Sequence, residues 1–433
     1  MRFSFQCCRR GPIFLVALVV LIVLGAGFGY AWIGGTRVCN VARRFINARD
    51  FDSALQVLRP TEGKDSSAEV AYLAAVAYRR NGDVREARRF LRRAAELKWA
   101  GSDIELQRCL LVAQSGQVAE AEPRLAEIMQ SDVDDHAAEQ ICEAMAKGHM
   151  IAFEMQKAMD CLDNWLRWQP NAPRAHMWRA EIYRRGQQAE LAIKDYGAVL
   201  ERDPSNYKAK FEMAKTMVET NDVAAGHKLL LECLEVKPDD PVVLANLAQS
   251  SRRLGELDQC VNFANRAIAS DPPKRSRITA LTELGQVQLA QGKASEAIKT
   301  FSQVIELDPG TLTVHYSLSR AYMLLGDKEA AKRSEREAQK VWNQDTRSFE
   351  ILQRLKDEPG NIELRVELAL ILYQQKQVVE AKRWLQSALL VDPHHRQAKE
   401  TLARINDGTL AVQDTAEATP SNESAGASPP NKR

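Results

Sequence analysis

The sequence predicts an all-α solenoid of about ten helix–turn–helix units, preceded by one transmembrane helix. Three observations carry this prediction. Pairs of small residues, twelve positions apart, recur along the chain; prolines follow the second small residue by twelve positions; and an uncharged apolar segment lies near the amino terminus. Most pairs follow one another at 33 to 37 residues. Such a period is typical of repeat proteins, in which each unit packs only against its neighbours.

The apolar segment is the first element in order. Residues 13–33 contain no charged side chain. As a helix, this segment is long enough to cross about 30 Å of hydrocarbon. The apolar core of a secretory signal is usually only about 7–15 residues, so an uncleaved anchor is favoured over a cleaved leader. We therefore expect a short basic tail at 1–12 and a transmembrane helix at 13–34. Arginines flank both sides almost equally, and we expect the repeat array on the non-cytoplasmic side of a bacterial inner membrane.

Each repeat consists of two apolar-periodic stretches separated by a turn. In the unit Leu281–Pro309 the turn falls at Gly292, and the proline ends the second helix because it disfavours helical backbone before it. Two antiparallel helices cross closely only where side chains are small, since larger ones would force the helices apart and open voids. The small pairs are Ala42/Ala54, Ala75/Ala87, Cys109/Ala121, Ala146/Ala158, Ala180/Ala192, Ala214/Gly226, Ala248/Cys260, Gly285/Ala297, Ser319/Ala331 and Ala369/Ala381.

This pattern resembles the tetratricopeptide repeat over about residues 35–405. The resemblance implies a right-handed superhelix whose first helices line a concave groove for protein or peptide partners. Repeats one to nine would occupy 35–343, and the last repeat with a capping helix 361–406. The wider step before the last pair predicts a single extra helix at 344–360. Residues 407–433 are poor in apolar side chains and are expected to be disordered.

The resemblance also assigns groove-facing positions, aligned on the first small residue of each repeat. In repeats five to nine these positions carry eight basic and two acidic side chains. A basic groove favours acidic extended segments through charge-assisted hydrogen bonds. The alternative is that arginines in the last turn of a helix simply complement its dipole. The candidate partner-binding residues are Arg174, Arg184, Arg185, Lys208, Lys215, Asn246, Gln249, Arg252, Arg253 and Arg320.

Some functional classes are disfavoured. A net charge of +2 argues against nucleic acid as the main partner. The chain has no glycine-rich phosphate loop, zinc-protease motif or nucleophile elbow, so we expect no catalytic residues, no metal and no cofactor. Acidic residues at 132–139 are interpreted as a helix start, where they favour the dipole, and not as metal ligands.

The leading hypothesis is therefore a single-pass, membrane-anchored scaffold that binds partner proteins or peptides through its groove. Two alternatives stay open. The first is a soluble exported repeat protein whose signal is cleaved. The second is a regulatory subunit of an envelope export or polysaccharide assembly complex.

Overall fold

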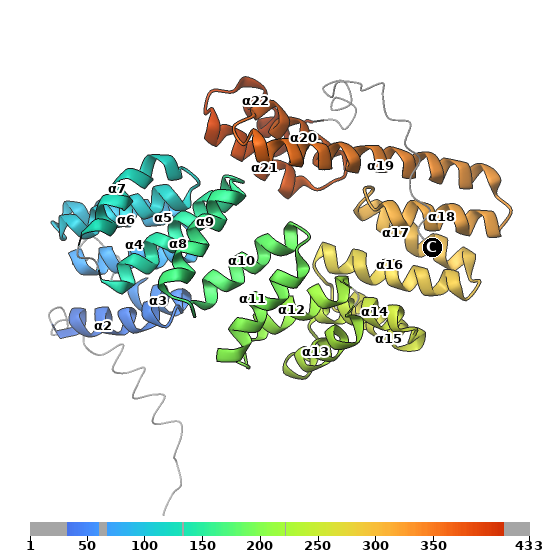
Figure 1. Ribbon diagram of the computed structural model, residues 1–433, viewed down its shortest axis with the longest axis horizontal. Coiled ribbons are helices and arrows are strands. Elements are labelled where there is room, and N and C mark those ends of the chain that lie inside the picture. The colour runs from blue at the N-terminus through green and yellow to red at the C-terminus, as the bar shows by residue number, and fades with distance from the viewer. Residues whose placement is uncertain (1–32, 60–66, 132–133, 221, 411–433) are drawn as a thin grey trace, which may run out of the picture. The chain divides into compact units, whose positions relative to one another are not determined.

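The computed structural model describes residues 33–59, 67–131, 134–220 and 222–410, and these ranges contain helices and no strand (Figure 1). The chain divides into two compact units, Met1–Ala144 and Met145–Arg433. The boundary falls inside helix α8 (Asp135–Ile151).

The described residues of the first unit form three helical hairpins before α8. They are α2 (Ile33–Asn47) with α3 (Phe51–Leu58), α4 (Ala68–Asn81) with α5 (Val84–Glu96), and α6 (Gly101–Gln114) with α7 (Val118–Gln130). Arg79 on α4 is buried, and its Nε donates to Gln107 Oε1 at 2.7 Å while Nη2 donates to Gln140 Oε1 at 2.5 Å. These hydrogen bonds offset the free-energy cost of burying the charged guanidinium group.

The second unit continues the hairpin pattern. Its helices are α9 (Met155–Trp168), α10 (Pro173–Arg185), α11 (Ala189–Arg202), α12 (Tyr207–Glu219), α13 (Val223–Val236), α14 (Pro241–Leu254), α15 (Leu257–Ala269), α16 (Lys274–Ala290), α17 (Ala294–Leu307), α18 (Leu312–Leu324), α19 (Lys328–Asp357), α20 (Ile362–Gln374), α21 (Val378–Val391) and α22 (Arg396–Asn406). From α10 to α21 each even-numbered helix pairs with the next, and α22 packs on α21.

The small-residue pairs lie where paired helices cross. Ala180 and Ala192 are fully buried at the crossing of α10 and α11. At Gly226 on α13, an added Cβ would lie 2.7 Å from the carbonyl oxygen of Ala214, the other member of its pair on α12. The two backbones therefore approach too closely for a larger side chain. Cys109 is an exception among the pairs, because it is only half-buried.

The turns and helix ends follow the expected punctuation. Helices α13 and α17 each end two residues before a proline, Pro238 and Pro309. Gly255 ends α14 with a left-handed backbone at φ +83°. Lys376 occupies the equivalent turn between α20 and α21 and adopts φ +56° without being glycine.

The extra helix expected at 344–360 is not separate. Residues 344–357 instead continue the second helix of repeat nine, so that α19 is one helix of 30 residues. The physical reason is that no proline or glycine lies between Lys328 and Asp357, and Asn343 stands where other repeats end in proline. The continued half is anchored by Ile351 and Leu355, which are buried.

The last repeat of the second unit returns to the start of that unit. The ring of Phe153, just after α8, stacks on Trp384 of α21 with centroids 3.8 Å apart. Arg365 of α20 is buried and donates from Nη1 to the carbonyl oxygen of Ala152 at 2.9 Å. We call Ala152, Phe153, Arg365 and Trp384 the closure contact. The second unit thus closes on itself through residues more than 200 positions apart in the sequence.

The membrane segment and the tail lie almost wholly outside the described residues. Of the transmembrane helix expected at 13–34, only Ile33 and Gly34 are described, as the first residues of α2. Among the residues that the structure describes, no helix combines the length and the apolar character that a membrane span requires. Residues 1–32, with the expected basic tail at 1–12, and residues 411–433 of the expected disordered tail lie outside the described residues.

Candidate functional site

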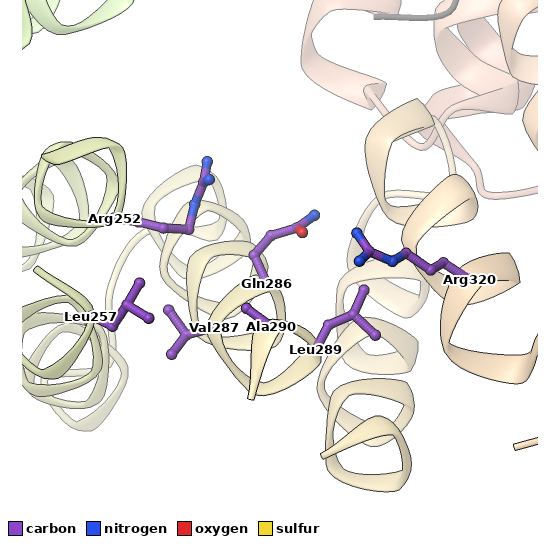
Figure 2. A pocket seen from close by; sticks show the side chains of 7 residues that line it. All are labelled: Arg252, Leu257, Gln286, Val287, Leu289, Ala290 and Arg320. Atoms are coloured by element: carbon purple, nitrogen blue, oxygen red, sulfur yellow. The ribbon is translucent and has the colours of Figure 1, made fainter. Parts of the chain in front are cut away.

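A recess opens on the first helices of three consecutive repeats in the second unit. It has a volume of about 240 Å³ and is lined by Arg252, Leu257, Gln286, Val287, Leu289, Ala290 and Arg320 (Figure 2). These residues come from α14, the start of α15, α16 and α18. The first helices are those that the resemblance places along the groove, and the recess contains the two predicted residues Arg252 and Arg320.

The polar side chains of the recess are held in different ways. Arg252 and Arg320 lie on opposite sides of Gln286, with Leu289 between Gln286 and Arg320 (Figure 2). The Nε of Arg252 donates to Glu283, whose side chain is buried. The amide nitrogen of Gln286 donates to Ser317 Oγ at 2.7 Å, so this side chain is fixed by the neighbouring repeat. Arg320 is exposed and makes no hydrogen bond or ion pair among the described residues.

Three other arginines of the predicted basic groove have hydrogen-bond acceptors within the protein. Arg184 and Arg185 both donate to Glu181 on the same helix, at 3.0 and 2.7 Å. Arg184 also lies 3.9 Å from Glu219 of the next repeat. Arg253 donates to the carbonyl oxygen of Val218. Carboxylates within the protein therefore pair with Arg184, Arg185 and Arg252, and binding of acidic segments by the predicted strip stays a prediction.

The two arginines stabilise the charged form of Glu181. Burial disfavours its charged form, but hydrogen bonds from Arg185 and the charges of Arg184 and Arg185 outweigh burial and lower the pKa of Glu181. The pKa of Arg184 is raised for the complementary reason: burial opposes the charge, and Glu181 more than compensates. This cluster is a closed charge network and offers little unpaired charge to a ligand.

The remaining predicted residues are dispersed along the first helices. Asn246 donates to the carbonyl oxygen of Val242 at 2.7 Å, a bond within its own helix. Lys208 is exposed on α12, whereas Lys215 and Gln249 are half-buried. Arg174 is half-buried in the first turn of α10. None of these five residues lines the recess.

Two residues that shape the recess were missed by the sequence reasoning. Glu283 lies 31 positions after Arg252, and Ser317 lies 31 positions after Gln286. Both contacts join equivalent faces of adjacent repeats. A search for complementary polar side chains about one repeat apart would have found them.

The acidic segment at 132–139 acts as a helix start where it is described. Asp134 Oδ1 accepts from the backbone nitrogen of Ala137 at 2.7 Å, next to the first turn of α8. Glu139 pairs with Arg49. Within the described ranges, no group of three or more His, Cys, Asp or Glu side chains is arranged to hold a metal ion.

Comparison with known families agrees with the hairpin geometry. Sequence models of the tetratricopeptide repeat match residues 41–102, 158–207, 288–334 and 347–405. The chain contains tetratricopeptide repeats. The resemblance inferred from the small residues is thereby confirmed for the repeats, which as a class mediate protein–protein interaction.

Individual relatives match only part of this tetratricopeptide repeat chain. Bacteriophage adsorption protein A of Escherichia coli is 29% identical over 108 residues, which are 25% of this chain and 11% of that protein. Small glutamine-rich tetratricopeptide repeat-containing protein 2 of Saccharomyces cerevisiae is 30% identical over 115 residues, 26% of this chain and 32% of that protein. A tetratricopeptide repeat protein from Parabacteroides merdae has a crystal structure that covers 59% of this chain and 98% of its own, at 16% identity and a TM-score of 0.41.

Proposed function

We propose that this chain is a non-catalytic scaffold that binds a segment of a partner protein in the recess between α14, α16 and α18. The observation that carries the proposal is the composition of the recess. It opens on the first helices of three consecutive repeats, and an arginine lies on each side of it. The exposed side chains of Met323 and Leu324 next to the recess would supply apolar contact, and the guanidinium groups would orient the ligand.

The size of the recess favours a side chain over a cofactor or metabolite. Its volume is about 240 Å³. Pockets for small molecules usually measure roughly 300–1,000 Å³ and bury most of the ligand. A recess of this size accepts one large side chain of a longer segment whose remaining residues lie along the neighbouring helices.

The proposal includes a place in the cell. The uncharged segment 13–33 would anchor the chain, and α2 begins at Ile33, so the first repeat would follow the span without a linker. We place the array on the non-cytoplasmic side of a bacterial inner membrane. Carbonate extraction of native membranes tests the anchor, and amino-terminal sequencing of the mature chain tests the alternative of a cleaved signal. Release by carbonate, or a mature terminus beyond residue 33, would remove the anchor from the proposal.

Site-specific photo-crosslinking in the native host tests partner binding. Leu324 on α18 and Val379 on α21 are each 59% exposed, so a benzoylphenylalanine at either position reaches solvent equally. We expect discrete crosslinked partners from position 324 and none of the same partners from position 379. Mass spectrometry then identifies the partner and shows whether it belongs to an export or polysaccharide assembly complex. Identical crosslinks from both positions would contradict the proposed site.

A further inference from the structure

One face of α18 leaves a mixed stripe of side chains uncovered. Tyr316, Arg320, Met323 and Leu324 follow one another at helical spacing and point to the same side of the helix. Tyr316 is 40% exposed, Met323 54% and Leu324 59%. Large apolar side chains exposed together and next to a binding recess are typical of an interaction surface.

The charge available to a ligand at this stripe is small and localised. Arg252 is paired with Glu283, and the arginines of α10 are paired with Glu181. Arg320 makes no hydrogen bond or ion pair among the described residues. A strongly acidic ligand would find one uncommitted guanidinium at the recess and apolar surface around it, which suits a single carboxylate better than a run of them.

The recess adjoins the stripe. Leu289 on α16 lies next to Arg320, and Ala290 lies between Leu289 and Val287 (Figure 2). Val287 and Leu289 are buried, so the exposed apolar surface here belongs to Met323 and Leu324 of the stripe. Gln286 already uses its amide nitrogen for Ser317. A large apolar side chain of a ligand would contact Met323 and Leu324 and leave the hydrogen bond between Gln286 and Ser317 intact.

We propose that the recess and the α18 stripe select a partner segment with one carboxylate and, two residues away, a large apolar side chain. This inference rests on the proposed partner binding and narrows the ligand. Alternate side chains of an extended segment share one face and lie roughly 7 Å apart. Arg320 and Leu324 are one helical turn apart, about 6 Å along the axis. The carboxylate would bind Arg320 while the apolar side chain packs on Met323 and Leu324.

Selection from a random decapeptide display library tests the inference. The full chain is immobilised in detergent as wild type, as Arg320→Glu and as Arg336→Glu. Arg336 is a matched control, because it is an exposed arginine on α19 of the same repeat and makes no ion pair among the described residues. We expect wild type and Arg336→Glu to enrich peptides with Asp or Glu two positions from Leu, Met or Phe. Arg320→Glu should weaken the best such peptide by about tenfold or more and should enrich Lys or Arg at the acidic position.

The outcomes separate the inference from the proposed function. The selected peptides could be acidic, lose binding in Arg320→Glu and show no preference for an apolar residue. That result would overturn the inference and leave the proposed partner binding intact. Enrichment that is unchanged in Arg320→Glu places the site elsewhere and overturns both. No enrichment from wild type contradicts peptide binding itself. Displacement of the selected peptide by decanoate at equal concentration would assign the recess to a small amphiphilic acid and also overturn the inference.

Discussion

His176 is held as an imidazolium between two acceptors. Its Nδ1 lies 2.8 Å from Asp195 Oδ1, and its Nε2 lies 2.8 Å from the carbonyl oxygen of Pro170. A carboxylate oxygen and a carbonyl oxygen only accept hydrogen bonds, so both ring nitrogens must donate. Both nitrogens carry a hydrogen only in the charged imidazolium form. The hydrogen bond to Asp195 is the main cause of the raised pKa of His176 and outweighs the opposing effect of burial. One histidine therefore ties the end of α9 to α10 and α11.

This arrangement predicts that stability falls as pH rises. Since the folded pKa of His176 lies above its unfolded value of about 6.5, its stabilising effect is complete below pH 6.5 and is lost as pH rises through the folded pKa. Urea unfolding at pH 6, 7, 8 and 9 should show wild type losing stability relative to His176→Gln over this range. Parallel profiles for the two proteins, or an NMR titration that gives His176 a pKa below 6.5, would contradict the assignment.

Helix pairing and helix ends were predictable from local composition. Ala180 and Ala192 lie at one helix crossing, because only small side chains let two helices pack closely. Pro238 and Pro309 follow the ends of their helices, because the proline ring is incompatible with continued helical backbone. Both effects depend on residue type alone and can therefore be predicted from the sequence. The continuity of α19 could have been read from its lack of proline and glycine, but the unusual repeat spacing suggested a break instead.

The charge of the site was less predictable than its position. Helical periodicity determines the direction of a side chain, and the predicted residues Arg252 and Arg320 both line the recess, whereas their role in binding stays a prediction. Whether an arginine is neutralised depends on which carboxylate of the next repeat reaches it, as Glu283 reaches Arg252. That pairing depends on the angle between repeats, which the periodicity does not encode.

A pair of glycine variants tests the role of the small residues. In Gly226→Ala the new Cβ would lie 2.7 Å from the Ala214 carbonyl oxygen, so the helices must separate, at a cost of about 1–3 kcal/mol. Gly197 on α11 is the matched control, because nothing lies within 4 Å of a Cβ there. Gly197→Ala should stabilise by about 0.5–1 kcal/mol, since alanine loses less conformational entropy in a helix. Thermal and urea unfolding compare the two variants, and stabilisation by both would show that α12 and α13 do not cross closely at Gly226.

At the scale of the molecule, the closure contact distinguishes the second unit from a simple repeat array. Repeats in a solenoid contact only their neighbours, so terminal repeats fray first. Here Arg365 and Trp384 in the last repeat contact Ala152 and Phe153 at the start of the unit. Arg365 also donates from Nε and Nη2 to the carbonyl oxygen of Pro359, so each of its three guanidinium nitrogens makes a hydrogen bond. The unit should therefore resist fraying at both ends.

A double-mutant cycle tests closure in solution. We expect Phe153→Ala and Trp384→Ala each to destabilise the second unit, and their combination to cost less than the sum by about 0.5–1.5 kcal/mol, the usual coupling of a stacked aromatic pair. Urea unfolding of the full chain provides the four free energies. Strictly additive effects would mean that the rings do not touch and that the unit is open.

The central claim is that a partner protein binds in the recess between α14, α16 and α18. Hydrogen–deuterium exchange of the full chain, with and without the partner segment recovered by crosslinking, tests it most directly. At saturation we predict slower exchange at Gln286–Ala290 and Arg320–Leu324 and no change on the second helices α11 and α21. Protection that lies on the second helices, or that is absent from α16 and α18, would contradict the claim.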